Sequence, residues 1–565
     1  MAELANAVSL CEMSRDHGGE LGWVSPEDYH LDDKFPEELR KAALMKKPGD
    51  LYLETSRLGT HIVHVDDVFQ TLTPTLRRRA PKIHNPDVGY AQPRTPLGEL
   101  LGTDQDLTYS METMGCQMNA ADSERMAGTL EEMGLVRHPD DADKKDFPNV
   151  VVINTCSIRD HAEQKVYSIL GPYAARKRRG EPVAIVVAGC VAQQEGGRLL
   201  RRFPEIDAVI GPQYANRLGE VLESAMEGNQ VVAVEPAFIS EDVTKPRRDS
   251  SVCAWVNIIY GCNERCTYCV VPGTRGVEQS RTPDAIVKEI QGLGEQDFRE
   301  VTLLGQNIDA YGRDMSPKRR FADLMRTIDE YGGAPSLARV RFATSHPRYM
   351  SDDVVDTIAS SIKGSGDSHG RLMPVFHIPA QSGSDKVLRE MGRGYTKQRY
   401  MQIVDRINRY FPTSAQGHVA ITSDFIVGFP GETEEEFQET LQLMEEVKFS
   451  SAMCAAYSPR PNTPAALWEN QVPENVKERR LKEIQALQEK HALFRSTELL
   501  DTEQEILVEG PNPKDATQVV GRTPTNRLTY FPGDAAELTG KIVRVRITEA
   551  RPFTLSGERV GTHAY

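Results

Sequence analysis

The stretch Gly261-Cys262-Asn263-Glu264-Arg265-Cys266-Thr267-Tyr268-Cys269 places three thiols in a C-x3-C-x2-C spacing. Three cysteines are one fewer than the four that saturate a cubane iron–sulfur cluster. A [4Fe–4S] cluster bound here would therefore leave one iron open to a small molecule. The alternatives are a zinc knuckle and thiols that merely lie close together. Structural zinc sites usually take four ligands from two C-x2-4-C pairs, and the sequence offers no second pair, so the spacing favours the cluster.

The cysteine stretch lies near the start of an alternation of apolar runs and helical stretches. Six such alternations predict a parallel sheet curved into an open barrel, an α/β fold. The expected strands are Ala254–Ile259, Glu300–Leu304, Arg339–Ala343, Pro374–Ile378, Ile421–Val427 and Ala452–Tyr457, and the expected helices include Asp284–Leu293, Asp323–Tyr331 and Glu434–Val447. Thr433 and Glu436 form a capping-box pattern at the start of the last helix. Sites in such barrels lie at the C-terminal ends of the strands, and the cysteine stretch follows the first strand.

Three more short strands precede this barrel, and each runs directly into a cysteine. The strands Tyr109–Thr113, Val150–Asn154 and Ala184–Ala188 are followed by Cys116, Cys156 and Cys190. Parallel strands present their C-terminal loops at one edge of a sheet, so these distant thiols can converge. The alternative is three buried structural cysteines, which behave as small hydrophobic residues. The repeated placement at strand ends favours a second three-thiolate cluster, again with one iron free.

Composition restricts the class of protein. The 565 residues suggest three or four domains. No apolar run approaches the roughly 18–20 residues of a membrane span, and no signal or transit peptide is readable, so we expect a soluble intracellular protein. Nine cysteines are too few for a secreted disulfide framework. A net charge of −15 argues against indiscriminate coating of nucleic acid. The basic run Arg176-Lys177-Arg178-Arg179 is then either a solvated helix end or a local RNA contact.

The C-terminal part begins with a long charged helix, Glu474–Thr497. Its apolar residues recur at helical spacing and are expected to dock on the barrel: Leu481, Ile484, Leu487 and Leu493. Short strands separated by Gly and Pro follow, at Glu505–Val508, Gln518–Arg522, Leu528–Phe531, Ile542–Ile547 and Thr554–Arg559. They predict a small β-barrel of about sixty residues, a shape often used to bind RNA.

The cysteine sets and the motifs around them resemble the MiaB-type methylthiotransferases, which add a methylthio group to a modified adenosine in tRNA. The resemblance covers about residues 106 to 565. The motifs that carry it are Gly115-Cys116-Gln117-Met118-Asn119, Asn154-Thr155-Cys156-Ser157-Ile158-Arg159, Ala188-Gly189-Cys190-Val191-Ala192, Cys269-Val270-Val271-Pro272-Gly273-Thr274-Arg275-Gly276, Leu304-Gly305-Gln306-Asn307, Thr344-Ser345-His346-Pro347, Gln381-Ser382-Gly383-Ser384 and Asp424-Phe425-Ile426-Val427-Gly428-Phe429-Pro430-Gly431. Two of them, at residues 154–157 and 269–272, favour the isopentenyladenosine branch over the ribosomal-protein and threonylcarbamoyl-adenosine branches. One departure is Gly273, where family members often carry a bulkier residue.

The resemblance implies a fold in three parts. These are a Rossmann-like methylthiotransferase N-terminal domain at residues 106–235, an open (β/α)6 radical S-adenosylmethionine (SAM) barrel at residues 248–498, and a β-barrel TRAM domain that binds RNA at residues 499–565. It implies a [4Fe–4S] cluster on Cys262, Cys266 and Cys269, whose open iron would bind SAM. A second [4Fe–4S] cluster on Cys116, Cys156 and Cys190 would deliver sulfur from its open iron.

The chemistry implied by this family explains the two clusters. Carbon C2 of adenine is neither acidic nor electrophilic, so replacing its hydrogen with sulfur calls for a radical. Electron transfer to SAM would yield a 5′-deoxyadenosyl radical that abstracts the hydrogen, and a second SAM would supply the methyl group. The residues expected to face SAM or the base are Gly305, Gln306, Asn307, Ser345, His346, Gln381, Ser382 and Asp424. The expected partners are the anticodon stem-loop of tRNA and an electron donor such as a flavodoxin or ferredoxin, while no membrane is expected.

The N-terminus does not belong to this family. Gly18–Trp23, Lys47–Asp50 and Gly59–Val65 resemble the C-terminal half of a parvulin-type peptidyl-prolyl isomerase, so residues 1–70 are identified as a partial α+β parvulin-like segment. His61 matches an active-site position of that family, but the strand that carries its other active-site histidine is missing. With Cys11-Glu12-Met13-Ser14 before the glycines, the segment resembles fusions found in plastid proteins, which implies a plastid or other organelle, with the cytoplasm as the alternative. Residues 71–105, rich in Pro and Arg, read as a linker.

Two other functions stay open at this point. The chain can be a methylthiotransferase that acts on a different modified adenosine. It can also be an interaction protein that resembles a peptidyl-prolyl isomerase and carries a degenerate enzyme domain. Iron content separates the second possibility from the first, because two four-iron cubanes give about eight irons per chain.

Overall fold

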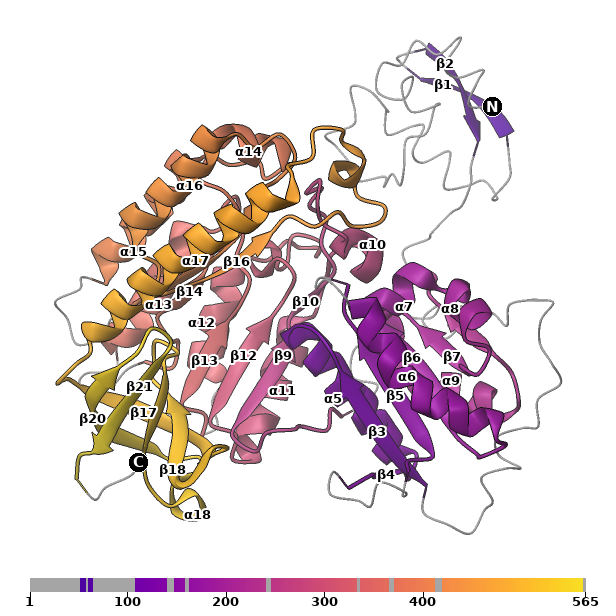
Figure 1. The fold of residues 1–565 in the computed structure, drawn as a ribbon, viewed down its shortest axis with the longest axis horizontal. Helices are drawn as coiled ribbons and strands as arrows, with labels where there is room; N and C mark the ends of the chain where they lie inside the picture. The colour runs from indigo at the N-terminus through magenta and orange to yellow at the C-terminus, as the bar shows by residue number, and fades with distance from the viewer. Residues whose placement is uncertain are drawn as a thin grey trace. The chain divides into compact units, whose positions relative to one another are not determined.

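The computed structural model describes residues 51–56, 59–64, 107–139, 147–157, 162–239, 245–332, 336–364, 370–411 and 419–561. The chain divides into two units, Met1–Lys82 and Ile83–Tyr565. In the first unit, strands β1 (Leu51–Ser56) and β2 (Gly59–His64) form an antiparallel hairpin (Figure 1). The rest of the predicted parvulin-like segment and the predicted linker at residues 71–105 lie outside the described residues.

The second unit begins with a parallel sheet of six strands in the order β4-β3-β5-β6-β7-β8. The strands are β3 (Thr108–Thr113), β4 (Val136–Arg137), β5 (Val150–Thr155), β6 (Ala184–Gly189), β7 (Ala208–Ile210) and β8 (Val231–Ala233). Strand β5 is buried throughout, and its alternate residues enter two separate cores, Val150 and Val152 in one and Val151 and Ile153 in the other. Helices cover both faces, as a doubly buried parallel sheet requires. They are α5 (Gln117–Glu132), α6 (Ala162–Arg178), α7 (Cys190–Glu195), α8 (Gly197–Arg202), η3 (Pro212–Arg217) and α9 (Leu218–Met226).

This strand order determines where the sheet can bind a ligand. Strand β3 lies between β4 and β5. The connection from β3 therefore leads to β4 on one side, and the next connection crosses to β5 on the other side. In open α/β sheets with this order, ligands bind beyond the carboxyl ends of the strands at the point where the order reverses. That point lies between β3 and β5. Cys116 and Cys156 directly follow these two strands, and Cys190 follows the adjacent strand β6.

The six strands expected in the barrel are present, all parallel where they pair and arranged in chain order. They are β9 (Cys253–Asn257), β12 (Glu300–Leu304), β13 (Arg339–Phe342), β14 (Val375–His377), β15 (Ala420–Val427) and β16 (Ser451–Ala456). A single bridge between Val340 and Leu372 joins the two halves of the sheet. Strands β10 (Ile259–Tyr260) and β11 (Gln279–Ser280) form an additional hairpin that the sequence did not predict.

Helices line the outer face of this barrel and bury its apolar core, which includes Ile286, Ile328, Ile358, Ile407 and Phe437 (Figure 1). On the outer face are α11 (Pro283–Glu295), α12 (Phe321–Tyr331), α13 (Asp352–Gly364), α15 (Lys397–Tyr410) and α16 (Glu434–Val447). The short elements α10 (Val271–Arg275), η4 (Ile308–Ala310) and α14 (Asp385–Glu390) lie in the connections that leave the C-terminal ends of the strands. Thr433 and Glu436 form the predicted capping box, in which the Thr433 hydroxyl accepts from the Glu436 backbone and the Glu436 carboxylate accepts from the Thr433 backbone.

The long helix α17 (Glu474–Thr497) follows a short turn, η5 (Pro464–Leu467), and runs beside β16 and α16. Ile484 is fully buried in the barrel core, and Leu481 and Leu487 pack against that core. The prediction that Leu493 docks there is wrong, because its side chain is 40% exposed. The neighbouring His491 is buried instead and lies 3.0 Å from a Glu445 carboxylate oxygen. Among the described helices, α17 included, we find none with the length and apolar character needed to cross a membrane.

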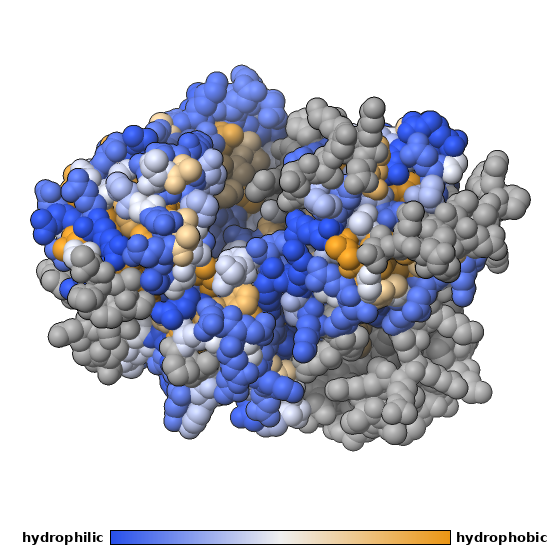
Figure 2. All heavy atoms as spheres, turned by 90° about the horizontal axis from the view of Figure 1, so that it is seen from below, coloured by the Kyte–Doolittle hydropathy of each residue, from blue (hydrophilic) through white to orange (hydrophobic). Residues whose placement is uncertain are grey.

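The C-terminal domain is a closed β-barrel, as the sequence predicts, and its strand order is β17-β18-β19-β21-β20. Its elements are β17 (Glu503–Asn512), β18 (Asp515–Arg522), β19 (Leu528–Pro532), α18 (Ala535–Leu538), β20 (Ile542–Ala550) and β21 (Thr554–Arg559). It is attached to the larger barrel through two buried arginines of β13. Arg339 donates to the carbonyls of Arg522 and Glu505, and Arg341 donates to those of Thr523 and Pro524. Seen from below, the molecule is largely hydrophilic, with hydrophobic residues in small separate areas (Figure 2).

The basic run at the end of α6 is a set of ion pairs. Arg176 and Arg179 both pair with Glu181, Lys177 pairs with Asp207, and Arg178 pairs with Glu205. Each cation therefore has a carboxylate partner from this domain. This supports the interpretation of residues 176–179 as a helix end and gives no support to a local RNA contact.

Candidate functional site

The first thiol set lies in the loop between β10 and α10. Backbone hydrogen bonds shape this loop: the Cys262 amide donates to the Gly276 carbonyl at 3.1 Å and the Cys269 amide to the Cys266 carbonyl at 3.0 Å. Burial is the main cause that raises the pKa of Cys262 to about 12 and of Cys269 to about 11, and the neighbouring Cys266 contributes to both increases. The buried Arg393 donates to the Cys266 sulfur at 3.6 Å. The three thiols are thus close neighbours with a fixed cation beside them.

The second thiol set converges as the strand order requires. Gly115 has a φ of +120°, and a Cβ atom at this position would lie 2.5 Å from Cβ and 2.9 Å from Sγ of Cys156. The Cys116 thiol contacts Asn119 Oδ1 at 3.3 Å, and the Asn119 amide donates to the Thr155 carbonyl at 2.9 Å. Cys190 is buried at the start of α7, which raises the pKa of its thiol, and Cys116 is near enough to raise it further. The thiols of Cys116, Cys156 and Cys190, which follow β3, β5 and β6, therefore lie near one another at the carboxyl edge of the sheet.

All eight cysteines of the described residues are free thiols. Each set supplies three of them, one fewer than the four irons of a cubane cluster.

Polar residues at the C-terminal strand ends carry buried atoms with no partner within the described part of the chain. These atoms, none of which has a hydrogen-bond partner there, are both amide atoms of Asn257 and of Asn307, and Nε2 of His346, which lies 4.0 Å from a Glu264 carboxylate oxygen. A buried polar atom without a hydrogen bond costs free energy, so it marks a place where a ligand can supply the missing partner. Asn307 and His346 were predicted as site residues. Asn257, at the end of β9, was not.

His346 is held as a neutral imidazole. Its Nδ1 accepts from the Arg348 amide at 3.2 Å, which leaves the proton on Nε2. Burial is the main cause that lowers its pKa to about 2, and the cations Arg393 and Arg348 contribute to this decrease. Asp309 positions this loop, because its carboxylate accepts from the His346 amide at 2.9 Å and from the Ser345 hydroxyl at 3.3 Å. Burial raises the pKa of Asp309 to about 7 against the lowering effect of these two hydrogen bonds. The sequence analysis did not identify Asp309.

The other predicted site residues have mainly backbone or local contacts. Gln381 has a φ of +66° and exchanges backbone hydrogen bonds with β15, through Asp424 and Ile426. The Ser382 hydroxyl bonds to Thr440 at 3.2 Å. Gly305 and Gln306 form the turn after β12. Asp424 lies on β15 with a carboxylate oxygen 3.4 Å from His377 Nε2, and its side chain is partly exposed.

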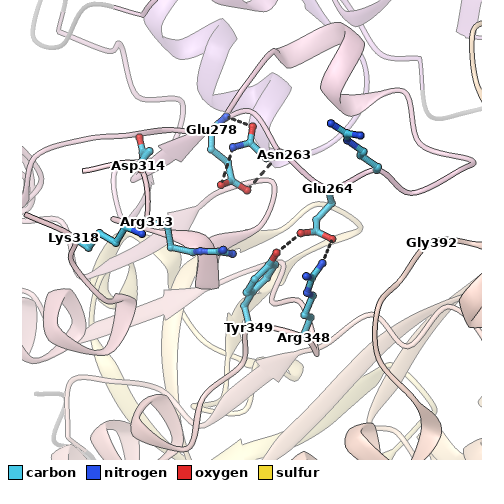
Figure 3. A pocket seen from close by; sticks show the side chains of 10 residues that line it. Asn263, Glu264, Glu278, Arg313, Asp314, Lys318, Arg348, Tyr349 and Gly392 are labelled. Atoms are coloured by element: carbon cyan, nitrogen blue, oxygen red, sulfur yellow. Dashed lines mark hydrogen bonds and ion pairs between the residues drawn. The ribbon is translucent and has the colours of Figure 1, made fainter. Parts of the chain in front are cut away.

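A cavity of about 470 Å³ opens beside the first thiol set. Its lining comes from the cysteine loop, the segment before β11, the loops after β12 and β13 and the turn after α14 (Figure 3). The residues are Asn263, Glu264, Arg265, Glu278, Arg313, Asp314, Lys318, Arg348, Tyr349 and Gly392. The Tyr349 hydroxyl donates to Glu264, whose carboxylate also pairs with Arg348 at 3.6 Å. The Arg313 guanidinium lies 4.3 Å from the Tyr349 ring centre. Four cations, three carboxylates and an aromatic ring line the cavity, so its lining carries one more positive than negative charge.

Comparison with known proteins identifies the domains. Residues 256–444 match the radical SAM superfamily, residues 108–211 match the uncharacterized protein family UPF0004, and residues 500–560 match the TRAM domain. The chain therefore contains a radical SAM domain, a UPF0004 domain and a TRAM domain, a combination that fits a methylthiotransferase. Its cofactors are [4Fe–4S] clusters and SAM, and two clusters fit this combination of domains. The matches lie between residues 108 and 560, so the parvulin-like segment stays a prediction.

Similar solved structures are radical SAM enzymes. One is the radical S-adenosylmethionine methyltransferase TsrM from Kitasatospora setae, with a TM-score of 0.47 and 16% identity over 64% of this chain and 74% of that chain. Another is the cobalamin-dependent S-adenosylmethionine radical enzyme OxsB, with a TM-score of 0.45 and 11% identity over 68% of this chain and 56% of that chain. A third is coproporphyrinogen III oxidase, HemN, from Escherichia coli, with a TM-score of 0.32 and 14% identity over 53% of this chain and 67% of that chain.

Proposed function

We propose that the protein is a tRNA methylthiotransferase that inserts sulfur and a methyl group at C2 of an isopentenyl-modified adenosine at position 37, next to the anticodon. The observation that carries the proposal is the presence of two separate three-thiol sets, one on the radical SAM domain and one on the UPF0004 domain. Radical generation alone requires only the first set. The second set gives the protein a place to hold the sulfur that is transferred.

The residues of the chain fit the cofactors that this reaction needs. When bound, the clusters and SAM would supply an electron, a radical that can take the C2 hydrogen, and the sulfur and methyl groups to be transferred. Cys262, Cys266 and Cys269 would hold one cluster, and Cys116, Cys156 and Cys190 the other. The buried atoms of Asn257, Asn307 and His346 that have no partner offer hydrogen bonds to SAM or the base, with His346 donating from Nε2.

Three further features support an RNA substrate. The TRAM domain is a small β-barrel of a kind that binds RNA. Its turn at residues 523–524 is fixed to β13 by Arg341, so RNA bound there has a defined position relative to the radical SAM domain. The cavity beside the first thiol set is lined by Arg313 and Lys318, which can neutralise backbone phosphates. We propose that an anticodon stem-loop occupies both surfaces and that a flavodoxin or ferredoxin reduces the clusters.

Mass spectrometry of tRNA nucleosides tests the proposal. The chain is expressed in a bacterial strain that lacks its own methylthiotransferase but still forms isopentenyladenosine. We expect methylthio-isopentenyladenosine to appear with the natural sequence and to be absent with Cys190→Ala or Cys262→Ala. A methylthio group on a different adenosine would replace the proposed substrate, and the absence of any methylthio nucleoside while both clusters are assembled would overturn the function.

A further inference from the structure

One residue of the radical SAM domain reaches into the second thiol set. Arg275 is the last residue of α10, the short helix that begins two residues after Cys269. Its side chain is only 5% exposed and forms an ion pair of 2.9 Å with Asp122 on α5 of the UPF0004 domain. It also donates to Asn119 Oδ1 at 3.5 Å and to the Cys190 thiol. Arg275 is part of a motif quoted above, but its sequence context indicates no role for it.

These contacts join the two thiol sets through a short rigid path. Asn119 contacts both the Cys116 thiol and the Arg275 guanidinium. The backbone carbonyl of Arg275 in turn accepts from the Gln213 side chain of the UPF0004 domain at 3.3 Å. Arg275 is thus held by the UPF0004 domain at both its side chain and its backbone. Because α10 follows directly on the cysteine loop, this contact fixes the first thiol set relative to the second.

The charges at this contact explain why an arginine is buried here. Asp122 balances the guanidinium, and burial of both groups is tolerated because they are paired. Cluster assembly on Cys116 and Cys190 converts neutral thiols to thiolates beside the same guanidinium. Hydrogen bonds to the sulfur ligands of an iron–sulfur cluster are among the factors that set its reduction potential, and they favour the reduced, more negative state. Arg393 has the corresponding position beside Cys266 in the first set.

We propose that Arg275 is a positioning residue that couples the two clusters. It fixes their separation by joining α10 to α5, and it stabilises the reduced state of the second cluster by donating to Cys190. This inference rests on the proposed function only in assuming that the second set binds a cluster. It predicts that the reduction potential of one domain's cluster depends on a residue of the other domain.

The test uses the full chain and observes the second cluster alone. Cys262, Cys266 and Cys269 are replaced by Ala in three chains, one with Arg275 unchanged, one with Arg275→Gln and one with Arg275→Lys. Iron content, the electron paramagnetic resonance spectrum and the reduction potential are measured for each. Hydrogen exchange of α5 and α10 is measured in the iron-free natural sequence and in Arg275→Gln. The matched control is Arg198→Gln, which changes a 71% exposed arginine of the same domain as Cys190.

We expect Arg275→Gln to shift the potential of the second cluster to a more negative value and to speed hydrogen exchange in α5 and α10, while Arg198→Gln changes neither. If Arg275→Gln does not fold or does not bind iron, Arg275→Lys decides: a shift in the same direction supports the proposal and an unchanged potential overturns it. An unchanged potential together with unchanged exchange in a folded Arg275→Gln variant also overturns it. The readouts need no tRNA, so they are independent of the substrate. If the natural second set binds no iron, the proposed function fails first.

Discussion

Gly115→Ala is a substitution that should prevent assembly of the second cluster and leave the first intact. An alanine Cβ at this position would lie 2.5 Å from Cβ of Cys156, whereas ordinary contacts begin at 3.4 Å, so the Cys156 side chain must move by about 0.9 Å. The φ of +120° adds strain, because residues with a Cβ rarely adopt it. Ligand distances in metal sites hold to within about 0.2 Å, so a displacement of this size is incompatible with ligation.

Anaerobic reconstitution followed by iron analysis measures the effect. The natural sequence should bind about eight irons per chain, and Gly115→Ala about four, because only the cubane on the first set assembles. Gly273→Ala is the matched control: it is the same substitution beside the other cysteine set, where an added Cβ meets nothing within 4 Å. It should retain about eight irons. If Gly115→Ala also retains about eight irons with an unchanged electron paramagnetic resonance spectrum, then Cys156 is not a ligand of the second cluster and the reasoning is refuted.

Further predictions concern the surrounding structure. Asp309 keeps its proton up to a pH of about 7 in the folded protein but only to about 4 when unfolded, so the stability it contributes is present at low pH and lost as the pH rises. Asp309→Asn should therefore raise the melting temperature of the iron-free protein more at pH 8 than at pH 5, by the equivalent of roughly 2–3 kcal/mol, and an equal effect at both would contradict this. Arg341→Ala leaves Glu300 and two TRAM carbonyls without their buried partner, so it should lower the free energy of unfolding by roughly 3 kcal/mol. It should also speed hydrogen exchange at residues 522–528, and unaltered exchange would mean that other contacts hold the TRAM domain. Thr433→Ala should destabilise by about 1 kcal/mol and Thr433→Ser by much less, as measured by thermal unfolding, since serine preserves the hydroxyl that caps α16. Arg313→Gln should weaken binding of an anticodon stem-loop and reduce the salt dependence of that binding by about one counterion, which a filter-binding titration at several salt concentrations would detect.

Local sequence signals predicted the parts of the fold that depend on local patterns. The barrel strands, the capping box at Thr433 and the five strands of the C-terminal barrel are where the sequence places them. Cys116, Cys156 and Cys190 could be found because each follows a strand, and Cys262, Cys266 and Cys269 because of their spacing. The short strands β4, β7 and β8 were missed, since two or three residues give no periodicity to read.

Residues whose role depends on a distant partner were beyond the reach of the sequence. Arg275 reads as the end of a short helix until the structure brings it to Asp122, more than one hundred and fifty positions earlier in the chain. Asp309 and Arg341 are likewise defined by what they contact across the fold. Leu493 shows a different failure, because it lies six residues after Leu487, which is not a helical repeat, and the same turn of α17 is buried through His491 and Ala492 instead.

The central claim is that the two thiol sets cooperate to replace the C2 hydrogen of a tRNA adenosine with a methylthio group. The most direct test supplies the reconstituted protein with SAM, a reductant and an isopentenyladenosine-containing stem-loop that carries deuterium at C2. We predict that deuterium appears in 5′-deoxyadenosine and that the stem-loop gains a methylthio group in the same reaction. Deuterium retained in the stem-loop, with 5′-deoxyadenosine formed but unlabelled, would contradict the account.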